Sequence, residues 1–259
     1  MSKRDAYPHG VPHWTTCLVR DLDRATEFYG RVLGWDFDIS PDDGYVVATV
    51  RGRAVAGIGT VPADWPAAQP GWITEVRVDD ATAAADAVIR AGGSVLAGPL
   101  DMSPASVLTV VADPSGAVLC ATQPVGRLGA ELVNEPGTWT MSALSTPDPS
   151  AVADFYRDVF GWEPQQFGPM TLWRLPGYVG GEPSQPVPRD VIAVGQASDG
   201  APRWDVDFRV ADADAAARAA REAGGNVVAE PAEQDSVPFR QAVLADPDGS
   251  AFSVSQLLL

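Results

Sequence analysis

Apolar positions recur along the chain with two periods, and each period predicts a different element. In the stretch 25–35 they fall three or four residues apart, which is the spacing of one buried face of an α-helix. These positions are Ala25, Phe28, Tyr29, Val32 and Leu33. Gly34 follows the last of them and is typical of a helix C-terminus. Strands are indicated by alternating stretches rich in Val and Thr at 13–19, 36–39, 45–50 and 54–59. The opening segment therefore predicts a strand, a helix and three further strands.

The same order of elements restarts after a loop rich in Pro and Ala. An Ala-rich helix is predicted at 81–91, capped by Asp79-Asp80 and stopped by Gly92-Gly93. Strands are expected at 72–78, 94–96, 107–112 and 118–123. This is a second unit of one strand, a helix and three strands.

The second half of the chain copies both units. Phe155-Tyr156 and Gly161-Trp162 repeat Phe28-Tyr29 and Gly34-Trp35 of the first helix. The other copied elements are the strands 138–145 and 204–210, the Ala-rich helix 213–223 and the Asp-Pro turn at 246–249, which matches 113–116. The repeat predicts a first domain at 1–123, a linker at 124–137 and a second domain at 138–259.

The second half is slightly longer than the first between its two helices. The extra residues are expected in the loop 176–189, whose Gly and Pro content favours an excursion over the surface. Such a loop can act as a lid or can be a longer hairpin without a function, and the residues leave both interpretations open.

Composition restricts the partners. The chain of 259 residues carries 34 acidic and 18 basic residues, a formal net charge of −16, which repels nucleic acid and anionic membranes. The N-terminus lacks the apolar core of a signal peptide, and no run approaches about 18 uninterrupted apolar residues. Two cysteines are too few for a disulfide framework. We expect a cytoplasmic protein with no nucleic-acid or membrane partner, either a monomer or a homodimer.

Four tandem strand-helix-three-strand units resemble the vicinal oxygen chelate superfamily. The motifs that carry the resemblance are Phe-Tyr-x-x-x-x-Gly-Trp in the odd units and Asp-Pro-x-Gly in the even ones. The superfamily contains glyoxalase I, extradiol dioxygenases and bleomycin-resistance proteins. The resemblance implies an α+β fold in which two units pair and their sheets curl around one cup, so this chain is expected to hold two cups. The fused form looks most like a branch of antigen-like and antibiotic-cluster proteins.

In this superfamily, His, Glu or Gln side chains that point into the cup hold a divalent metal ion. Counting from the repeated helices assigns the corresponding positions of the first half to Trp14, Ile73 and Cys120, and those of the second half to Met141, Asp205 and Ser253. His13 is expected on the opposite face of its strand, and a lone Asp205 or Cys120 cannot hold a catalytic ion. The sequence therefore predicts a metal-independent protein with no cofactor.

Strand alternation predicts what lines the cups instead. Glu75 and Arg77 would face the first cup, and Asp205, Asp207 and Arg209 the second. Charges withdrawn from water need partners, so an ion pair, a neutralised acid, or water and ligand are expected there. Two acids on one strand face would repel and raise one pKa, which suits proton transfer. A self-satisfied polar pair remains the alternative.

Aromatic and polar side chains complete the predicted binding residues. Trp14, Trp72, Trp139, Trp173 and Trp204 lie on or next to cup strands, and indole rings favour planar ligands, although core packing also explains many tryptophans. Trp35 and Trp162 are assigned to packing, and Cys120 is more simply a small buried residue than an activated thiol. The ligand-binding candidates are Trp14, Thr16, Tyr45, Glu75, Arg77, Cys120, Trp139, Met141, Trp173 and Ser253.

Three functions compete on this basis. The first is metal-independent conversion of a small hydrophobic or aromatic, polyketide-like metabolite, with Asp205 and Asp207 as proton-transfer groups and Arg209 as anion partner. The second is a non-catalytic protein of the drug-resistance type that sequesters such a compound. The third is a glyoxalase-like lyase, which the missing ligands disfavour.

Overall fold

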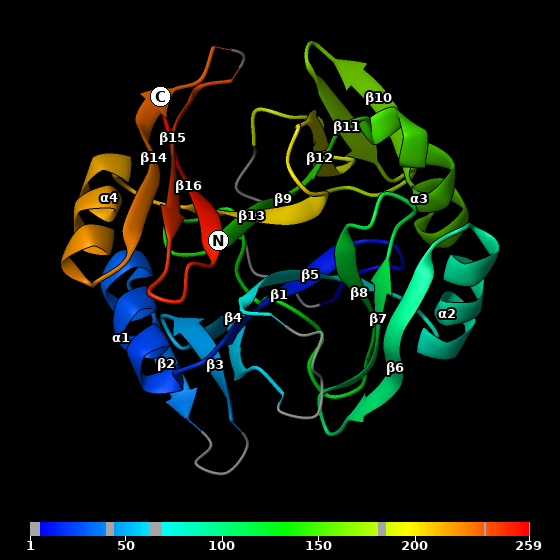
Figure 1. Ribbon diagram of the computed structural model, residues 1–259, viewed down its shortest axis with the longest axis horizontal. Coiled ribbons are helices and arrows are strands. Elements are labelled where there is room, and N and C mark those ends of the chain that lie inside the picture. Colours follow the sequence, from blue (N-terminus) through cyan, green and yellow to red (C-terminus); the bar gives the residue numbers. More distant parts are fainter. Residues whose placement is uncertain (1–5, 40–43, 63–68, 181–184, 236, 259) are drawn as a thin grey trace.

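The structure is a computed structural model that describes residues 6–39, 44–62, 69–180, 185–235 and 237–258. Its elements follow the predicted order of four units (Figure 1). The first unit consists of β1 (Pro12–Val19), α1 (Leu22–Leu33), β2 (Asp36–Ile39), β3 (Tyr45–Val50) and β4 (Arg53–Thr60). The second consists of β5 (Gly71–Arg77), α2 (Ala81–Arg90), β6 (Ser94–Met102), β7 (Ser106–Ala112) and β8 (Val118–Pro124).

The second half repeats this arrangement. Its third unit consists of β9 (Trp139–Thr146), a 3-10 turn (Pro149–Val152), α3 (Ala153–Phe160), β10 (Glu163–Phe167), β11 (Met170–Arg174) and β12 (Val191–Ala197). Its fourth unit consists of β13 (Arg203–Arg209), α4 (Ala213–Glu222), β14 (Asn226–Glu233), β15 (Phe239–Ala245) and β16 (Ala251–Leu257). The α+β class and the tandem units are thus confirmed.

The helix ends follow local capping chemistry. Asp21 precedes α1 and accepts a hydrogen bond from the Arg24 backbone N–H at 3.0 Å, and Asp80 caps α2 in the same way. Gly34 ends α1 in the left-handed region, with φ of 71°. β6 extends beyond the predicted 94–96 to Met102 and contains Pro99. It lies at the edge of the sheet, where a proline without a backbone N–H is tolerated.

Each half forms one curved sheet of eight strands. The strand order is β2-β3-β4-β1-β5-β8-β7-β6 in the first sheet and β10-β11-β12-β9-β13-β16-β15-β14 in the second. Within a unit the first strand pairs in parallel with the last, and the two units of a sheet join through the antiparallel pairs β1–β5 and β9–β13. The centre of each sheet is therefore built from the first and last strands of its two units.

The repeated helices hold the two halves together. Figure 1 shows α1 beside α4 and α2 beside α3, so each helix pair combines elements of different halves. The ring of Phe28 lies over Gly225, where an added Cβ would be 2.4 Å from Phe28 Cε2. The Tyr29 hydroxyl donates to Asp246 Oδ2 at 3.0 Å and accepts from Trp72 Nε1 at 3.0 Å. The motif of the first unit thus docks on the Gly-Gly pair and the Asp-Pro turn of the fourth.

The third and second units make the reciprocal contact. Phe155 lies over Gly93, and the Tyr156 hydroxyl donates to Asp113 Oδ2 at 2.7 Å and accepts from Trp204 Nε1 at 3.0 Å. The tryptophan that ends each motif is buried beside that motif's own rings, Trp35 with Phe28 and Tyr29, and Trp162 with Phe155 and Tyr156. These motifs therefore stabilise the interface between halves. No helix in the described part of the chain is long and apolar enough to cross a membrane.

Candidate functional site

The central strands present alternate side chains to opposite faces of each sheet. In β1, Cys17 lies 3.5 Å from the Tyr29 hydroxyl in the interdomain core. Its neighbour Thr16 points the other way, and its hydroxyl donates to Glu75 Oε1 at 2.7 Å. We call the concave face that contains Thr16 and Glu75 the first cup, and the equivalent face of the other sheet the second cup.

Glu75 lies at the centre of the first cup and is buried. Besides the bond from Thr16, its Oε2 accepts from Thr122 Oγ1 at 3.1 Å. Burial raises the pKa of this carboxyl, while the two hydroxyl donors and the charge of Arg127 oppose the shift. The carboxyl of Glu75 is thus held in the first cup by two hydroxyl donors.

Tyr45 and Arg127 cross the same cup. The Tyr45 hydroxyl accepts from Trp14 Nε1 at 3.0 Å and from Arg127 Nη1 at 3.2 Å. The Arg127 guanidinium also stacks 4.7 Å from the centre of the Trp14 ring. The tyrosine ring fits because β4 has Gly57 and Gly59 beneath it, where a Cβ would lie 1.8 Å and 2.9 Å from the nearest tyrosine atoms. The chain's own side chains therefore occupy much of this cup.

The remaining candidates of the first cup, Arg77 and Cys120, do not take part in the hydrogen bonds around Glu75. Arg77 pairs with the exposed Asp79 rather than with Glu75. Cys120 is paired with Glu75 in the strand register and is buried, and burial raises the pKa of its thiol well above the ordinary value. The thiol is therefore protonated and not an activated nucleophile.

Asp207 takes the position of Glu75 in the second cup. Both of its carboxylate oxygens lie 2.6 Å from Ser255 Oγ, and Oδ1 also accepts from Gln241 Nε2 at 3.2 Å. Loss of hydration raises the pKa of this carboxyl to about 6, although both donors and the charge of Arg209 lower it. The expected repulsion from a neighbouring acid is not the cause. Ser253 is paired with Asp207 on the adjacent strand.

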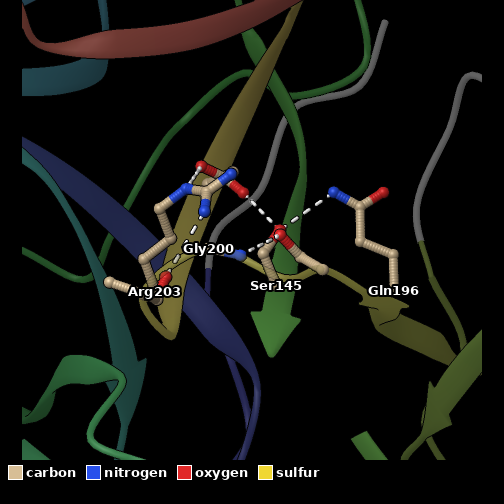
Figure 2. Close-up of polar contacts among 7 residues, drawn as sticks. Ser145, Gln196, Gly200 and Arg203 are labelled. Carbon is tan, nitrogen blue, oxygen red and sulfur yellow. Dashed lines mark hydrogen bonds and ion pairs between the residues drawn. The ribbon is translucent and has the colours of Figure 1, made fainter. Parts of the chain in front are cut away.

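Asp205 belongs to a separate polar cluster with Ser145, Gln196 and Arg203, which Figure 2 labels. Its Oδ2 accepts from Ser145 Oγ at 2.6 Å, and its Oδ1 accepts from Arg203 Nε at 2.8 Å. Gln196 Nε2 donates to the same serine hydroxyl at 2.9 Å. Asp205 is therefore held by an arginine and a serine, whereas Asp207 is held by neutral donors alone.

Arg209 lies on the same strand face and is only 4% exposed. Its guanidinium stacks 4.5 Å from the centre of the Phe239 ring. Nη2 donates to Thr140 Oγ1 at 3.3 Å and to Gln185 Oε1. Nε and Nη1 are buried and have no hydrogen-bond partner among the described residues.

A pocket opens where β9 and β12 begin, next to Arg209. Its wall combines apolar side chains with polar groups from β9, β12 and the described part of the loop 176–189, including Trp139, Thr140, Met141, Gln185, Arg189 and Ile192. The N-terminal segment and the linker close the other side through Tyr7, Val11, Val133 and Asn134. The pocket therefore lies between the second cup, the loop and the first half of the chain.

Two local irregularities displaced residues from their predicted faces. The pairing of β9 with β13 shifts between Met141 and Trp139, so Trp139 pairs with Phe208, packs into the interdomain core and contributes only to the pocket wall. A matching shift in β1 falls at His13, so the register that would put His13 on the opposite face does not hold there. Burial lowers the pKa of His13 to about 4, so it is neutral at neutral pH.

Most of the tryptophans that were predicted to contact a ligand are packed in the hydrophobic core. Trp173 is fully buried beside Tyr156 and Trp162, which contradicts its predicted ligand contact. Trp72 and Trp204 are occupied by their bonds to the two motif tyrosines. Period-two alternation does not distinguish the cup face from the helix-covered face of a strand that is apolar on both sides.

Sequence reasoning also missed residues that complete the cups. Gln241 on β15 and Gln196 on β12 could have been found by extending the alternation to these strands. Arg127 lies in the linker, where no periodic pattern indicates its direction.

Both halves match known family models. Residues 11–121 match the glyoxalase/bleomycin resistance protein/dioxygenase superfamily, and residues 139–255 match a glyoxalase-like domain. The chain is 37% identical to CFP32 of Mycobacterium bovis, which is provisionally named a glyoxylase. The alignment covers 98% of this chain and 97% of CFP32. The chain belongs to the glyoxalase/bleomycin resistance protein/dioxygenase superfamily.

A further relative and two solved structures extend the comparison. The anthracycline biosynthesis protein DnrV of Streptomyces peucetius is 30% identical over 96% of this chain and 94% of its own length. The Mn(II)-bound glyoxalase of Novosphingobium aromaticivorans has a TM-score of 0.67 at 15% identity, over 97% of this chain and 83% of that one. The 2,3-dioxygenase LapB of Pseudomonas sp. KL28 has a TM-score of 0.65 at 14% identity, over 97% of this chain and 94% of LapB. The two structures share the fold.

The donor set of this superfamily member does not fit a metal centre. The sequence counted Ile73 and Asp205 as the middle positions of the two ligand sets. Strand pairing instead places Glu75 between Trp14 and a protonated Cys120 in the first cup, and Asp207 between Met141 and Ser253 in the second, so each set contains one carboxylate. Among the described residues, no three His, Cys, Asp or Glu side chains lie close enough to share an ion. Asp205 has the right chemistry, but Arg203 and Ser145 already engage it.

Proposed function

We propose that the chain binds a small, mainly apolar or aromatic metabolite at the second cup and converts it by metal-independent proton transfer through Asp207. The observation that carries this proposal is the carboxyl of Asp207, whose pKa is raised to about 6 on the cup face. A carboxyl with a pKa near the working pH can take up a proton and give it back.

The surroundings of Asp207 support a proton-transfer role. Ser255 and Gln241 orient the carboxylate without neutralising its charge, since neither is ionised. In the proposed step the ionised carboxylate accepts a proton from a C–H or O–H group of the ligand and returns it to another atom of the same ligand. Asp205 has a supporting role, because its carboxylate is already engaged by Arg203 and Ser145. The step needs no oxidant or reductant.

The second cup is the better location for a ligand. A pocket with apolar walls adjoins it, whereas Tyr45 and Arg127 cross the first cup. The name of DnrV refers to anthracycline biosynthesis, and anthracyclines are polycyclic aromatic compounds, which supports a flat aromatic metabolite. The name of CFP32 would instead support a lyase, for which the present donor set is poor.

One observation favours binding without turnover. Both oxygens of Asp207 accept hydrogen bonds from within the protein, which is also expected of a polar group that only satisfies itself. A sequestering protein of the bleomycin-resistance type is therefore the second candidate.

A pair of variants separates the candidates. The compound that co-purifies with protein from its own host is identified by native mass spectrometry and then supplied to chelator-treated wild type, Asp207→Asn and Glu75→Gln. Catalysis predicts that D207N loses at least 100-fold in kcat, a magnitude typical of a lost general base, while the dissociation constant changes little. Loss of turnover in E75Q alone would move the site to the first cup. Tight stoichiometric binding without turnover by the wild type would establish sequestration.

A further inference from the structure

Arg209 carries hydrogen-bond donors that the protein does not use. Its side chain is 4% exposed, and Nη2 bonds to Thr140 and Gln185, yet Nε and Nη1 have no acceptor in the part of the chain that the structure describes. An arginine has five N–H donors and cannot serve as an acceptor. A buried charged group with unsatisfied donors costs free energy that a structural arginine normally avoids by pairing.

The neighbouring acids do not supply the missing acceptors. Asp207 lies two residues away on the same strand face, but its oxygens accept from Ser255 and Gln241. Asp205 is bonded to Arg203 and Ser145. On the other side, the guanidinium is covered by the face of Phe239, which offers no acceptor in the plane of the N–H groups.

The Arg209 guanidinium is bonded to the wall of the pocket through Nη2. Thr140 and Gln185, the two acceptors of Nη2, both belong to the pocket wall. The wall also contains large apolar side chains, among them Trp139, Met141 and Ile192. A pocket with large apolar side chains, Arg189 in its wall and Arg209 beside it fits an apolar molecule that carries one anionic end.

We propose that Arg209 is an oxyanion subsite, whose unused Nε and Nη1 donors bind a carboxylate on the ligand, and that the ligand is therefore a flat apolar carboxylic acid. This inference rests on the proposed placement of the ligand in the second cup. Residues two apart on a strand face are separated by about 7 Å, so a carboxylate at Arg209 directs the adjoining ligand atoms toward Asp207. Arg209 thereby determines which ligand atom meets the proton-transfer group.

Matched probes test this subsite without knowledge of the ligand. The probes are 1-naphthoate and its neutral analogue 1-naphthamide, and their dissociation constants are measured by isothermal titration calorimetry. Wild type is expected to bind the carboxylate at least tenfold more tightly than the amide. Arg209→Gln is expected to bind both probes equally, and Arg209→Lys to retain part of the preference, because it keeps the charge but not the separate donor directions.

The controls keep the outcomes distinguishable. Arg221→Gln removes an arginine charge from exposed α4, where Arg221 pairs with Glu230, and should retain the full preference. Circular dichroism and thermal unfolding verify that each variant folds. Equal affinities in wild type, an unchanged preference in R209Q, or no binding of either probe at millimolar concentration would overturn the inference. D207N should keep the preference, so a failure of the proton-transfer proposal leaves this result intact.

Discussion

At the scale of single residues, the two cups carry an acid at the same strand position and hold it differently. Glu75 is enclosed by two threonine hydroxyls, and Asp207 by a serine and a glutamine. Removal from water raises the pKa of both carboxyls. Such a shift must also appear in the stability of the protein, because protonation and folding are linked.

Asp207→Asn should change how stability depends on pH. The pKa of Asp207 is raised from 3.8 to about 6, so the folded state binds its proton more tightly than the unfolded chain does. The ionisation of Asp207 therefore lowers the stability of the wild type progressively as the pH rises from about 4 to about 6. Above that range the folded protein has the full destabilisation from the buried carboxylate. An asparagine does not ionise.

Thermal unfolding midpoints measured from pH 4 to pH 8 check this expectation. D207N should gain stability relative to wild type as the pH rises through 6 and lose that advantage near pH 4. A difference between the two proteins that stays constant over this range would show that the carboxyl is not desolvated.

At the scale of elements, the repeated helix motif acts as a docking device between halves. Phe28 and Tyr29 contact Gly225 and Asp246, and Phe155 and Tyr156 make the reciprocal contacts in the other half. A phenyl ring over a glycine requires close backbone approach, and a tyrosine hydroxyl on a turn aspartate fixes the angle of the helix.

Gly225→Ala should destabilise the protein by about 1–3 kcal/mol, the usual cost of overpacking. The added Cβ would lie 2.4 Å from the ring of Phe28 and 2.5 Å from the backbone oxygen of Ala245, which cannot move aside. Gly30→Ala is the matched control, because its nearest contact would be an ordinary 3.4 Å and alanine favours a helix. Urea unfolding at equal protein concentration compares them; equal stability of both variants would refute the docking role of Gly225.

Tyr156→Phe should cost about 1–3 kcal/mol for each buried partner left unsatisfied. The change removes the hydrogen bond to Asp113 and the acceptor of the Trp204 indole N–H. Tyr29→Phe has the same effect at the opposite helix pair, and the two losses should add because the sites share no contact. A double-mutant cycle by urea unfolding measures this, and a neutral Y156F would contradict the account.

Much of this architecture is readable from the sequence, but the contacts between units are not. The spacing of hydrophobic residues predicts the type of each element, and Gly, Pro and Asp residues mark where the elements end. The repeat predicts two sheets. Periodicity cannot show that Phe28 meets Gly225 of the other half. Single-residue shifts at His13 and Thr140 are likewise invisible, although they decide where Trp139 points. The acids of the candidate site follow from alternation, whereas the linker residue Arg127 does not.

At the scale of the whole molecule, duplication has produced two cups that are no longer equivalent. In the first, Tyr45 lies across Gly57 and Gly59, and Arg127 stacks on Trp14. In the second, a pocket adjoins a polar strand face with unused arginine donors. We expect one ligand per chain, determined by calorimetric titration with the co-purified compound; two equivalent sites would contradict this division.

The pH dependence of turnover after metal removal tests the central proposal most directly. Chelator-treated wild type should convert the co-purified compound with a rate controlled by one ionisation near pH 6, the pKa of Asp207. The rate should be lost in D207N and should not increase on addition of divalent metal ions. Activity that returns only with an added metal ion, or a D207N profile identical to that of wild type, would contradict the account.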